Sequence, residues 1–521
     1  MSSLPLLITS DADREVIIQA LREACFDERT VSARLGVRNL QAVGARHVKG
    51  LADRSGWDKL GVFVRIFLFG EVLGPREVAS ELPKETVETL LAVDLLRRCR
   101  QIIDGRKLGD ADDTPGSQRV DGWACPVSLV PIPLPGIGSC DAWVACDRMN
   151  STDGSSSRPA GDVVFSGHNP LTRQFLRMLP QSPTGSILEL CAGNGTGAIA
   201  SARLAPHVVA TDITPRSVHF GRFNAWLNGC SHVEWQTGDL YGAVPGRTFD
   251  RIVAHPPYVP TLAARAVYRD GGTTGEQVLQ GVVAGVPAHL APGGQFMMLC
   301  IGLDTETARF EERARAWLGD AAGEFDVIFG FEEQRTPEEY ARLLVERTAD
   351  APPEDFPKWR QLFADLQVSA VVYGVLAGCR RVAGTGPAET RRVRMGDGTR
   401  FDAFEWLFRW LERQRQPDHL ARVLAAVPRL SSSLRLDISY QPESGSLVPC
   451  DFRAENTGDP FPAQARVDPQ IARLLTLVDG QRTGREVASL CDAASGDAEP
   501  PDALAAARTI SNLAERGMLL L

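Results

Sequence analysis

This sequence has no long hydrophobic run and no closely spaced pair of cysteines. No apolar stretch among its 521 residues approaches the roughly 18 residues of a membrane-spanning helix, and the N-terminus lacks a basic segment followed by a long apolar core. The eleven cysteines lie far apart, without a Cys-x-x-Cys pair or a Cys/His cluster. We therefore expect a soluble cytoplasmic protein without a membrane anchor or a zinc site, whose thiols are reduced and buried.

Positive charge is in deficit as well. The chain carries 56 Lys and Arg against 65 Asp and Glu, which gives a net charge of −9 at pH 7. A chain of this balance gains little affinity for nucleic acid from bulk electrostatics, so we expect no nucleic-acid partner. The hydrophobic content of 44% and the charged content of 23% are those of ordinary globular domains.

Composition and periodicity change along the chain and divide it into five parts. The first shows short helical patterns broken by Gly-Pro and Leu-Pro, and predicts a winged-helix-like helical domain. A linker with a β-rich segment follows, then an α/β domain, an α+β extension and a second winged-helix-like module. These parts are placed at residues 1–110, 111–165, 166–350, 351–465 and 466–521. The helix FEWLFRWLERQ in the extension is expected to turn its aromatic face to a core rather than to stack on bases.

Five apolar strand patterns alternate with helical ones between residues 185 and 305. The pattern SILELCAGNG is a strand that enters a glycine-containing turn, and the next four strands are HVVATDI, VEWQTGDL, FDRIVAHPPY and GGQFMMLCI. Strands that alternate with helices of about ten to fifteen residues predict βαβ units and a parallel sheet covered on both faces. Ligands of such sheets bind at the carboxyl ends of the strands.

Acidic side chains and a glycine-rich turn fall at those strand ends. Glu189 precedes the turn Ala192–Gly195, whose glycines let the backbone approach a ligand at the start of a helix. Asp212 ends the second strand, at the spacing typical of a carboxylate that binds ribose. Asp239 ends the third strand, where it can accept a hydrogen bond from an adenine amino group. Each aspartate alone fits a helix cap as well, but the ordered set favours an adenosyl ligand.

The motifs SILELCAGNGTGAIA, ATDI, GDLY and AHPPYVP, in this order within residues 160–305, resemble those of class I S-adenosylmethionine-dependent methyltransferases. The sequence is most similar to the branch with an Asn-Pro-Pro-Tyr/Phe tetrapeptide, which includes glutamine N5-methyltransferases of release factors and small-domain RNA methyltransferases. The resemblance implies an α/β fold with a Rossmann-like sheet, flanked by the N-terminal helical domain and the C-terminal α+β extension. It implies S-adenosyl-L-methionine as methyl donor and S-adenosyl-L-homocysteine as product. The cofactor-binding residues that it implies are Glu189, Cys191, Ala192, Gly193, Asn194, Gly195, Asp212, Ile213, Asp239, Leu240 and His255.

Two residues depart from that branch. Cys191 stands where the turn has its first glycine, and because cysteine is small we expect cofactor binding to survive. His255 stands where the family has Asn, Asp or Ser; there the side chain and the carbonyl of the next proline orient a planar amino group toward the methyl donor. A neutral imidazole accepts the same hydrogen bond, but it also takes a proton near pH 7. Whether His255 positions the acceptor, acts as a base or fills the pocket wall stays open, as does loss of activity.

The catalytic set implied by the tetrapeptide is His255, Pro256 and Tyr258, with the tyrosine ring facing a flat acceptor. Polar residues before and after the sheet strands are candidates for the substrate side, although two of them also fit helix starts. These candidates are His168, Arg269, Asp270 and Glu276. No metal ligand set is expected.

We expect an S-adenosylmethionine-dependent methyltransferase that moves a methyl group to a nitrogen of a small molecule, in natural product biosynthesis. Three alternatives stay open: a protein or peptide side chain as acceptor, an O-methyltransferase with His255 as general base, and a cofactor-sensing DNA-binding protein. The acidic balance argues against the last of these. A homodimer is compatible with the sequence, which does not set the oligomeric state.

Overall fold

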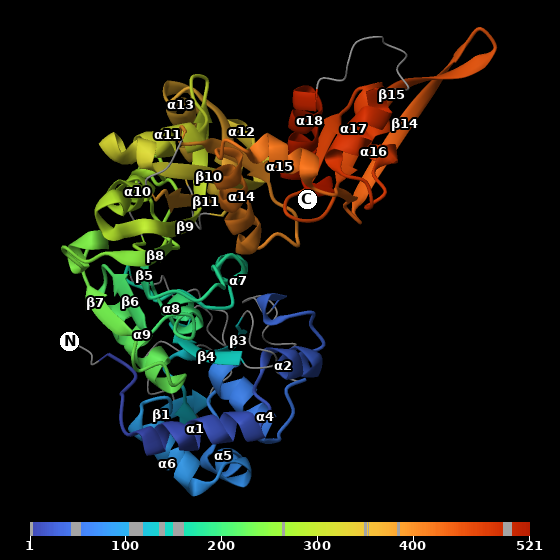
Figure 1. The fold of residues 1–521 in the computed structure, drawn as a ribbon. Coiled ribbons are helices and arrows are strands. Elements are labelled where there is room, and N and C mark those ends of the chain that lie inside the picture. The colour runs from blue at the N-terminus through green and yellow to red at the C-terminus, as the bar shows by residue number, and fades with distance from the viewer. Residues whose placement is uncertain are drawn as a thin grey trace. The chain divides into compact units, whose positions relative to one another are not determined.

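The chain forms two compact units, Met1–Ala291 and Pro292–Leu521, and each is described by itself (Figure 1). The computed structural model describes residues 4–42, 54–103, 118–134, 141–148, 161–262, 266–347, 352, 354–382, 386–492 and 503–521. Much of the linker expected at residues 111–165 lies outside the described residues, namely 111–117, 135–140 and 149–160, as do residues 104–110 before it. None of the helices in these ranges is both long and apolar enough to cross a bilayer.

The first unit begins with short helices around a cluster of phenylalanines. The rings of Phe26, Phe63 and Phe67 are buried, with centroids 5.3 to 6.0 Å apart. The antiparallel pair of strands β1 (Arg97–Ile103) and β2 (Gln118–Ala124) follows the helices. The winged-helix likeness of this segment stays a prediction. The helical elements are α1 (Asp11–Glu23), α2 (Glu28–Leu35), η1 (Leu40–Ala42), α4 (Lys59–Phe63), the π-helix η3 (Val64–Phe69), α5 (Pro75–Glu81) and α6 (Lys84–Ala92).

Four parallel strands follow in the first unit, in the spatial order β7-β6-β5-β8. Their side chains are mostly buried in β5, β6 and β8, as expected of strands covered on both faces. This confirms the alternation of strands and helices read from the sequence. The elements are α7 (Pro170–Arg177), β5 (Ser186–Leu190), α8 (Thr196–Ser201), β6 (His207–Asp212), α9 (Pro215–Leu227), β7 (Glu234–Thr237), η4 (Leu240–Ala243), β8 (Phe249–Ala254) and α10 (Gln277–His289).

Two asparagines of the α9 segment bind the edge of a second hairpin, β3 (Ser128–Pro133) and β4 (Asp141–Cys146). The Asn224 Oδ1 accepts the backbone N–H of Ala145 at 2.8 Å, and its Nδ2 donates to the Ala145 carbonyl at 2.9 Å and to the Asn194 carbonyl at 2.8 Å. Asn228 binds Trp143 of the same strand in the same manner. Asn224 therefore joins β4, α9 and the glycine-rich turn.

Replacing Asn224 by alanine is expected to lower the free energy of unfolding by about 2–4 kcal/mol, because it leaves one buried N–H and two carbonyls without their partner. Asn228→Ala, at a position that is only half-buried, should cost less. Denaturant titration of the two variants beside the wild type measures the difference. Equal midpoints for Asn224→Ala and the wild type would contradict this account of the contact.

The second unit contains a mixed set of strands in the order β9-β11-β10-β12. Strand β11 (Val368–Arg380) runs antiparallel to both β9 (Leu290–Thr305) and β10 (Phe325–Arg335), whereas β12 (Thr390–Arg394) is parallel to β10. The sequence predicts a parallel sheet only for the strands between residues 185 and 305, and the antiparallel strand β11 comes from the segment expected to form an α+β extension. An apolar run such as VVYGVLAG has the composition of a buried strand in either direction, so the sequence pattern did not reveal the reversal.

Helices of this unit pack their apolar faces inward. The buried side chains of α14 (Phe401–Gln414) include Phe404, Phe408 and Trp410, which confirms that its aromatics form a core face. Two arginines are held in buried ion pairs: Arg392 binds Asp304 and Glu311, and Arg415 binds Asp326. The other helices are α11 (Phe310–Ala316), η5 (Gly319–Glu324), α12 (Pro337–Glu346), α13 (Asp355–Asp365) and α15 (His419–Ala425).

The C-terminal part of the second unit contains a three-stranded antiparallel sheet and three helices. The sheet order is β14-β15-β16, and its first two strands form a long hairpin. The elements are β13 (Arg429–Leu430), β14 (Leu434–Glu443), β15 (Ser446–Asn456), β16 (Ala463–Arg466), α16 (Pro469–Leu477), α17 (Gly484–Asp492), α18 (Ala503–Glu515) and β17 (Leu519–Leu520). Both the second winged-helix-like module and the five-part division stay predictions.

The cysteines among the described residues are all free, but they are not all buried. Cys25 and Cys450 are exposed, which corrects the expectation of uniformly buried thiols. Cys25 adopts φ 51° at the end of α1, and Cys450 is the extra residue where the β14–β15 register shifts. Both lie where regular structure is interrupted, and hydrophobic composition alone does not reveal such positions.

Candidate active site

The chain passes from β5 into α8 through a turn with left-handed backbone. Cys191, Gly193 and Gly195 have φ values of 56°, 55° and 83°. A Cβ on Gly195 would lie 2.5 Å from the Trp235 ring, whereas a Cβ on Gly193 would meet no atom within 4 Å. The turn is thus pressed against Trp235 on one side and faces open space on the other, as backbone that approaches a ligand must.

Cys191 is the non-glycine residue of this turn that adopts a left-handed backbone conformation, which its Cβ disfavours. Left-handed φ costs a non-glycine residue about 1–2 kcal/mol, and a β-branched residue more. We therefore expect Cys191→Gly to keep or raise the melting temperature, and Cys191→Val to lower it by several degrees. Differential scanning fluorimetry of the two variants tests this, and a valine variant as stable as the glycine variant would contradict the turn geometry. Burial also raises the pKa of the Cys191 thiol, so the thiol is neutral.

Glu189 is a buried carboxyl beneath the turn. It is 2% exposed, and its Oε2 has no hydrogen-bond partner among the described residues. Burial raises its pKa to about 8, with a further contribution from the charge of Asp212. A Cβ on Gly197 of α8 would lie 2.2 Å from the Glu189 Oε1, so only glycine leaves room for this carboxyl. A buried acceptor without a donor fits a ligand that brings an ammonium group.

Asp212 is the last residue of β6, and Asp239 follows the end of β7 at the same edge of the sheet. Asp212 Oδ2 accepts the Gly193 N–H at 2.9 Å, and its Oδ1 accepts the N–H and hydroxyl of Thr214 at 2.9 and 3.0 Å. Asp239 is exposed and makes no side-chain cap to η4. Asp212 thus cross-links the turn to the start of α9, whereas the carboxylate of Asp239 faces solvent. The neighbouring Ile213 is 52% exposed, and Leu240 adopts φ 44°.

The tetrapeptide His255–Tyr258 follows β8 directly. The His255 ring stacks with two aromatic rings, and its centroid lies 5.3 Å from that of Phe175 and 5.9 Å from that of Tyr258. Desolvation in this setting lowers the pKa of His255 to about 4, so the imidazole is neutral at physiological pH. Tyr258 is 5% exposed. The stack fixes the plane of the imidazole at the end of the strand.

The loop before α10 runs along the tetrapeptide backbone. The Val259 N–H donates to the Arg269 carbonyl at 3.0 Å, and the Gly271 N–H donates to the Val259 carbonyl at 2.9 Å. A Cβ on Gly271 would lie 2.8 Å from the Pro257 carbonyl oxygen, so the close approach requires glycine. Asp270 accepts the N–H of Ala266 at 2.8 Å. Arg269 and Asp270 are therefore brought beside the tetrapeptide, and the loop ends in Glu276.

Glu276 precedes α10 and is 5% exposed, without a side-chain cap to that helix. His168 occupies a different segment, which lies against the glycine-rich turn: the Asn194 Nδ2 donates to the Phe165 carbonyl at 2.9 Å. The His168 Nδ1 lies 3.1 Å from the Ser166 Oγ, and desolvation lowers the pKa of His168 to about 4. The next residue, Asn169, caps α7.

Sequence reasoning missed three residues that shape the site: Phe175, Asn224 and Trp235. Phe175 stacks on His255 from α7, Asn224 holds the turn, and Trp235 packs beneath Gly195. The one visible signal was the pair of asparagines four residues apart in the apolar pattern RFNAWLNG, because a buried asparagine needs hydrogen-bond partners. Across the described residues, no group of three His, Cys, Asp or Glu side chains is placed to hold a metal.

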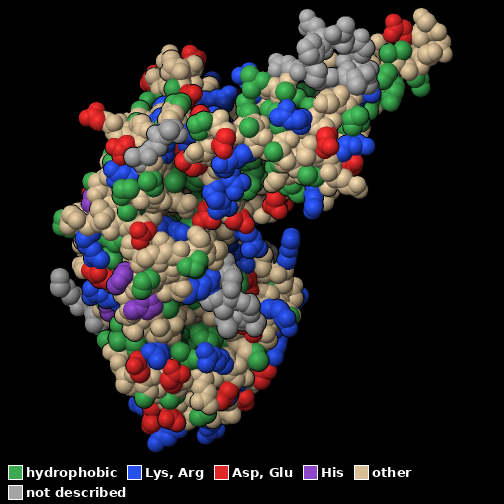
Figure 2. Space-filling view, viewed as in Figure 1, with side chains coloured by type: hydrophobic (Ala, Val, Ile, Leu, Met, Phe, Trp, Pro, Cys, Tyr) green, Lys and Arg blue, Asp and Glu red, His purple; other side chains and the backbone are tan. Residues whose placement is uncertain are grey.

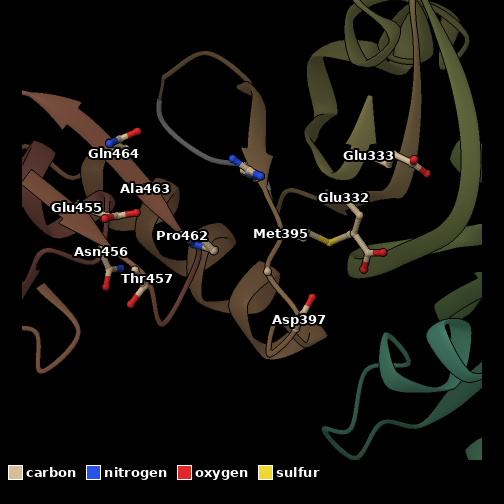
Figure 3. Close-up of a pocket in the computed structure, with 12 residues that line it drawn as sticks. Glu332, Glu333, Met395, Asp397, Glu455, Asn456, Thr457, Pro462, Ala463 and Gln464 are labelled. Carbon is tan, nitrogen blue, oxygen red and sulfur yellow. The ribbon is translucent and has the colours of Figure 1, made fainter. Parts of the chain in front are cut away.

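The second unit has a hollow of its own, of about 620 Å³ (Figure 3). Side chains from the end of β10, the β12–α14 loop and the β15–β16 segment line it, and most of its charged groups are acidic. Those charged residues are Glu332, Glu333, Asp397, Glu455 and Arg394. None of the site residues expected from the sequence lines this hollow.

The four parallel strands β7-β6-β5-β8, the left-handed turn over a buried glutamate and the Pro-Pro-Tyr segment at the same sheet edge define a class I S-adenosylmethionine-dependent methyltransferase domain. In agreement, residues 163–302 match the family model described as "Methyltransferase small domain". S-adenosylmethionine is the methyl donor typical of this family. The Glu189 Oε2, which has no hydrogen-bond partner among the described residues, and the open space beside Gly193 fit it.

Three curated relatives are similar to this part of the chain. The release factor glutamine methyltransferase of Xylella fastidiosa is 32% identical and covers 25% of this chain and 51% of its own length. That of Cereibacter sphaeroides is also 32% identical and covers 30% and 58%. The ribosomal protein uL3 glutamine methyltransferase of Bradyrhizobium diazoefficiens is 28% identical and covers 27% and 49%. The chain therefore spans about half the length of the curated relatives it matches.

Proposed function

We propose that this chain is a methyltransferase that transfers a methyl group from S-adenosylmethionine to the side-chain amide nitrogen of a glutamine in a protein. The observation that carries the proposal is the His-Pro-Pro-Tyr segment after β8, in which a neutral imidazole stacks with Phe175 and Tyr258. The named relatives, which act on glutamine in proteins, support this acceptor over the small molecule expected from the sequence.

The cofactor side of the site would be built from the glycine-rich turn and the strand ends. When bound, S-adenosylmethionine supplies an electrophilic methyl group on a sulfonium centre. Glu189, deprotonated as the ligand enters, would accept from its ammonium group, and Asp212 from its ribose hydroxyls. Asp239, exposed beyond β7, would accept from the adenine amino group, with Leu240 beside it.

The acceptor side needs two hydrogen-bond acceptors for one planar amide. The neutral ring of His255 and the carbonyl of Pro256 would each accept one N–H of the glutamine amide, which turns the nitrogen toward the methyl group. In the transfer a nitrogen–carbon bond forms, the sulfur–carbon bond breaks and the amide nitrogen loses one proton to water. A base with a pKa of about 4 retains a proton poorly at pH 7, which disfavours O-methylation driven by His255.

Tyr258 and the loop before α10 would form the wall around that amide. Tyr258 would contact its flat face, and Arg269, Asp270 and Glu276 would bind polar groups of the substrate next to it. Asn194 ties the segment that contains His168 to the glycine-rich turn, so this segment would cover the cofactor. These roles follow from the positions of the residues around His255–Tyr258.

The proposal is tested by methyl transfer from labelled S-adenosylmethionine to extracts of the source organism, divided into polypeptide and small-molecule fractions. We expect label in one or a few polypeptides. An inactive Gly193→Val variant, with a side chain in the open space that the ligand needs, controls for other methyltransferases in the preparation. Label that appears only in the small-molecule fraction would replace the protein acceptor with a small one.

A further inference from the structure

The hairpin of β14 and β15, here called the arm, projects from the second unit (Figure 1). Every residue of β14 from Asp437 to Glu443 is exposed. Alternate residues of β14 share one face, and on that face Leu436, Ile438 and Tyr440 are apolar, with Phe452 directly opposite Ile438. Ile438 is 37% exposed and Tyr440 is 54% exposed, and hydrophobic side chains are visible near the end of the arm (Figure 2).

The outer edge of β14 is a free edge of the sheet among the described residues, because β14 pairs with β15 alone. Such edges are usually protected by bulges, prolines or charges. The outer half of β14 contains one of these devices, Pro442, and lies opposite a second, the bulge at Cys450 of β15. The inner half, Leu434–Ile438, contains neither device. Its charged residues are Arg435 and Asp437, one of each sign. This half is a regular strand that can accept another strand.

We propose that two copies of this chain pair through the inner halves of their β14 strands, antiparallel about a two-fold axis at Leu436. A two-fold pairing places each residue opposite its mirror position, and residues directly opposite share a face. At this register Arg435 lies opposite Asp437 of the second copy, and Asp437 opposite its Arg435. Leu434 lies opposite Ile438 on the apolar face, so both faces are complementary.

Neighbouring registers do not satisfy both faces. An axis at Asp437 sets two aspartates opposite each other, and an axis at Arg435 sets two arginines opposite each other, which is destabilising. An axis between two residues places apolar side chains opposite polar ones. An axis at Ile438 forms no ion pair and sets Pro442, which has no N–H, opposite Leu434. Charge and polarity together select the register centred on Leu436, and with it a second copy as the occupant.

Sedimentation velocity of the full chain over the micromolar range tests this pairing. We expect a species of twice the 56.5 kDa chain mass. Arg435→Asp or Asp437→Arg alone creates like-charge pairs between the two copies and should weaken the dimer at least about tenfold, whereas the double variant restores both ion pairs between the copies and the dimer. Within the arm, residue 435 lies opposite Glu455 and residue 437 opposite Arg453, so each change also places like charges across β14 and β15, and every variant needs a check of its fold. Glu443→Arg, on the same strand outside the paired residues, should leave the dimer unchanged. Circular dichroism and thermal melts confirm that each variant is folded.

Three results would overturn the proposal. One is a wild-type chain that stays monomeric over this range, and another is a double variant that dimerises no better than either single variant. The third is a monomeric chain whose arm is needed to bind a different protein, since the arm would then be the docking site of that partner. The double variant separates register-specific pairing from a general effect of charge on the arm.

Discussion

Glu189→Gln is expected to stabilise the cofactor-free protein and to weaken S-adenosylmethionine binding about 30- to 100-fold, as loss of a hydrogen bond to a charged group does. The two effects have opposite signs because the carboxyl is buried with its Oε2 lacking a donor among the described residues until the ligand arrives. In the folded chain its pKa is raised to about 8 from an ordinary 4.5. Between these values the folded chain keeps a proton that the unfolded chain has released, so the free energy of unfolding falls as pH rises.

The same carboxyl makes cofactor binding depend on pH. Glu189 must lose its proton to accept from an ammonium group, so below about pH 7.5 the affinity should rise close to tenfold per pH unit. Binding should release one proton, which calorimetry in two buffers of different ionisation enthalpy detects. Glu189→Gln should release none.

Glu234→Gln is the matched control, since Glu234 is an exposed glutamate on β7 of the same sheet. A hydrogen bond from Arg247 holds the pKa of Glu234 below the ordinary value. Glu234→Gln should therefore leave both the cofactor affinity and the fall in stability between about pH 5 and pH 8 unchanged. If Glu189→Gln bound S-adenosylmethionine as tightly as the wild type did, Glu189 would not contact the cofactor. An unchanged stability profile would instead show that Glu189 is ionised in the cofactor-free protein.

His255→Leu is expected to lower kcat about 100- to 1000-fold with little change in the KM for S-adenosylmethionine. Leucine fills a similar space beside Phe175 and Tyr258 but offers no acceptor to orient the amide. His255→Asn, which restores an acceptor and the residue of the Asn-Pro-Pro-Tyr branch, should stay within about tenfold of the wild type. Steady-state assays with the unmethylated form of the polypeptide identified by labelling give kcat and KM for the wild type, His255→Leu and His255→Asn.

The pH profile separates positioning from base catalysis. With a His255 pKa of about 4, the kcat of the wild type should show no step near pH 6.5. A step there that is absent from His255→Asn would identify the histidine as a base. Equal rates for His255→Leu and the wild type would remove His255 from the mechanism.

Local sequence pattern was sufficient for the parallel half of the fold and for the row of strand-end residues. Apolar runs that end in a glycine turn or an aspartate specify both a strand and its carboxyl end, so Glu189, Asp212 and His255 could be placed from spacing. Strand direction beyond β9 could not, because β11 has the composition of a parallel strand. The projecting arm could not be predicted from the sequence either. Alternation of apolar and polar residues in LRLDISY predicts a strand, but not whether other residues cover its apolar face.

The finer chemistry of the site depends on contacts between distant segments. Phe175 from α7 and Tyr258 hold the His255 ring and remove it from water, and this lowers its pKa away from the value that the sequence suggested. Asn224 links the glycine-rich turn to Ala145 of β4, which lies 79 residues before Asn224 in the sequence. Neither contact leaves a periodic signal, because each depends on where the chain returns in space.

Tandem mass spectrometry of the labelled polypeptide tests the central proposal most directly. We predict one added methyl group on the side-chain nitrogen of a glutamine, formed by the wild type and His255→Asn and almost absent with His255→Leu. A methyl group on a lysine, a carboxylate, a hydroxyl or a free metabolite would contradict the assignment of a glutamine amide as the acceptor.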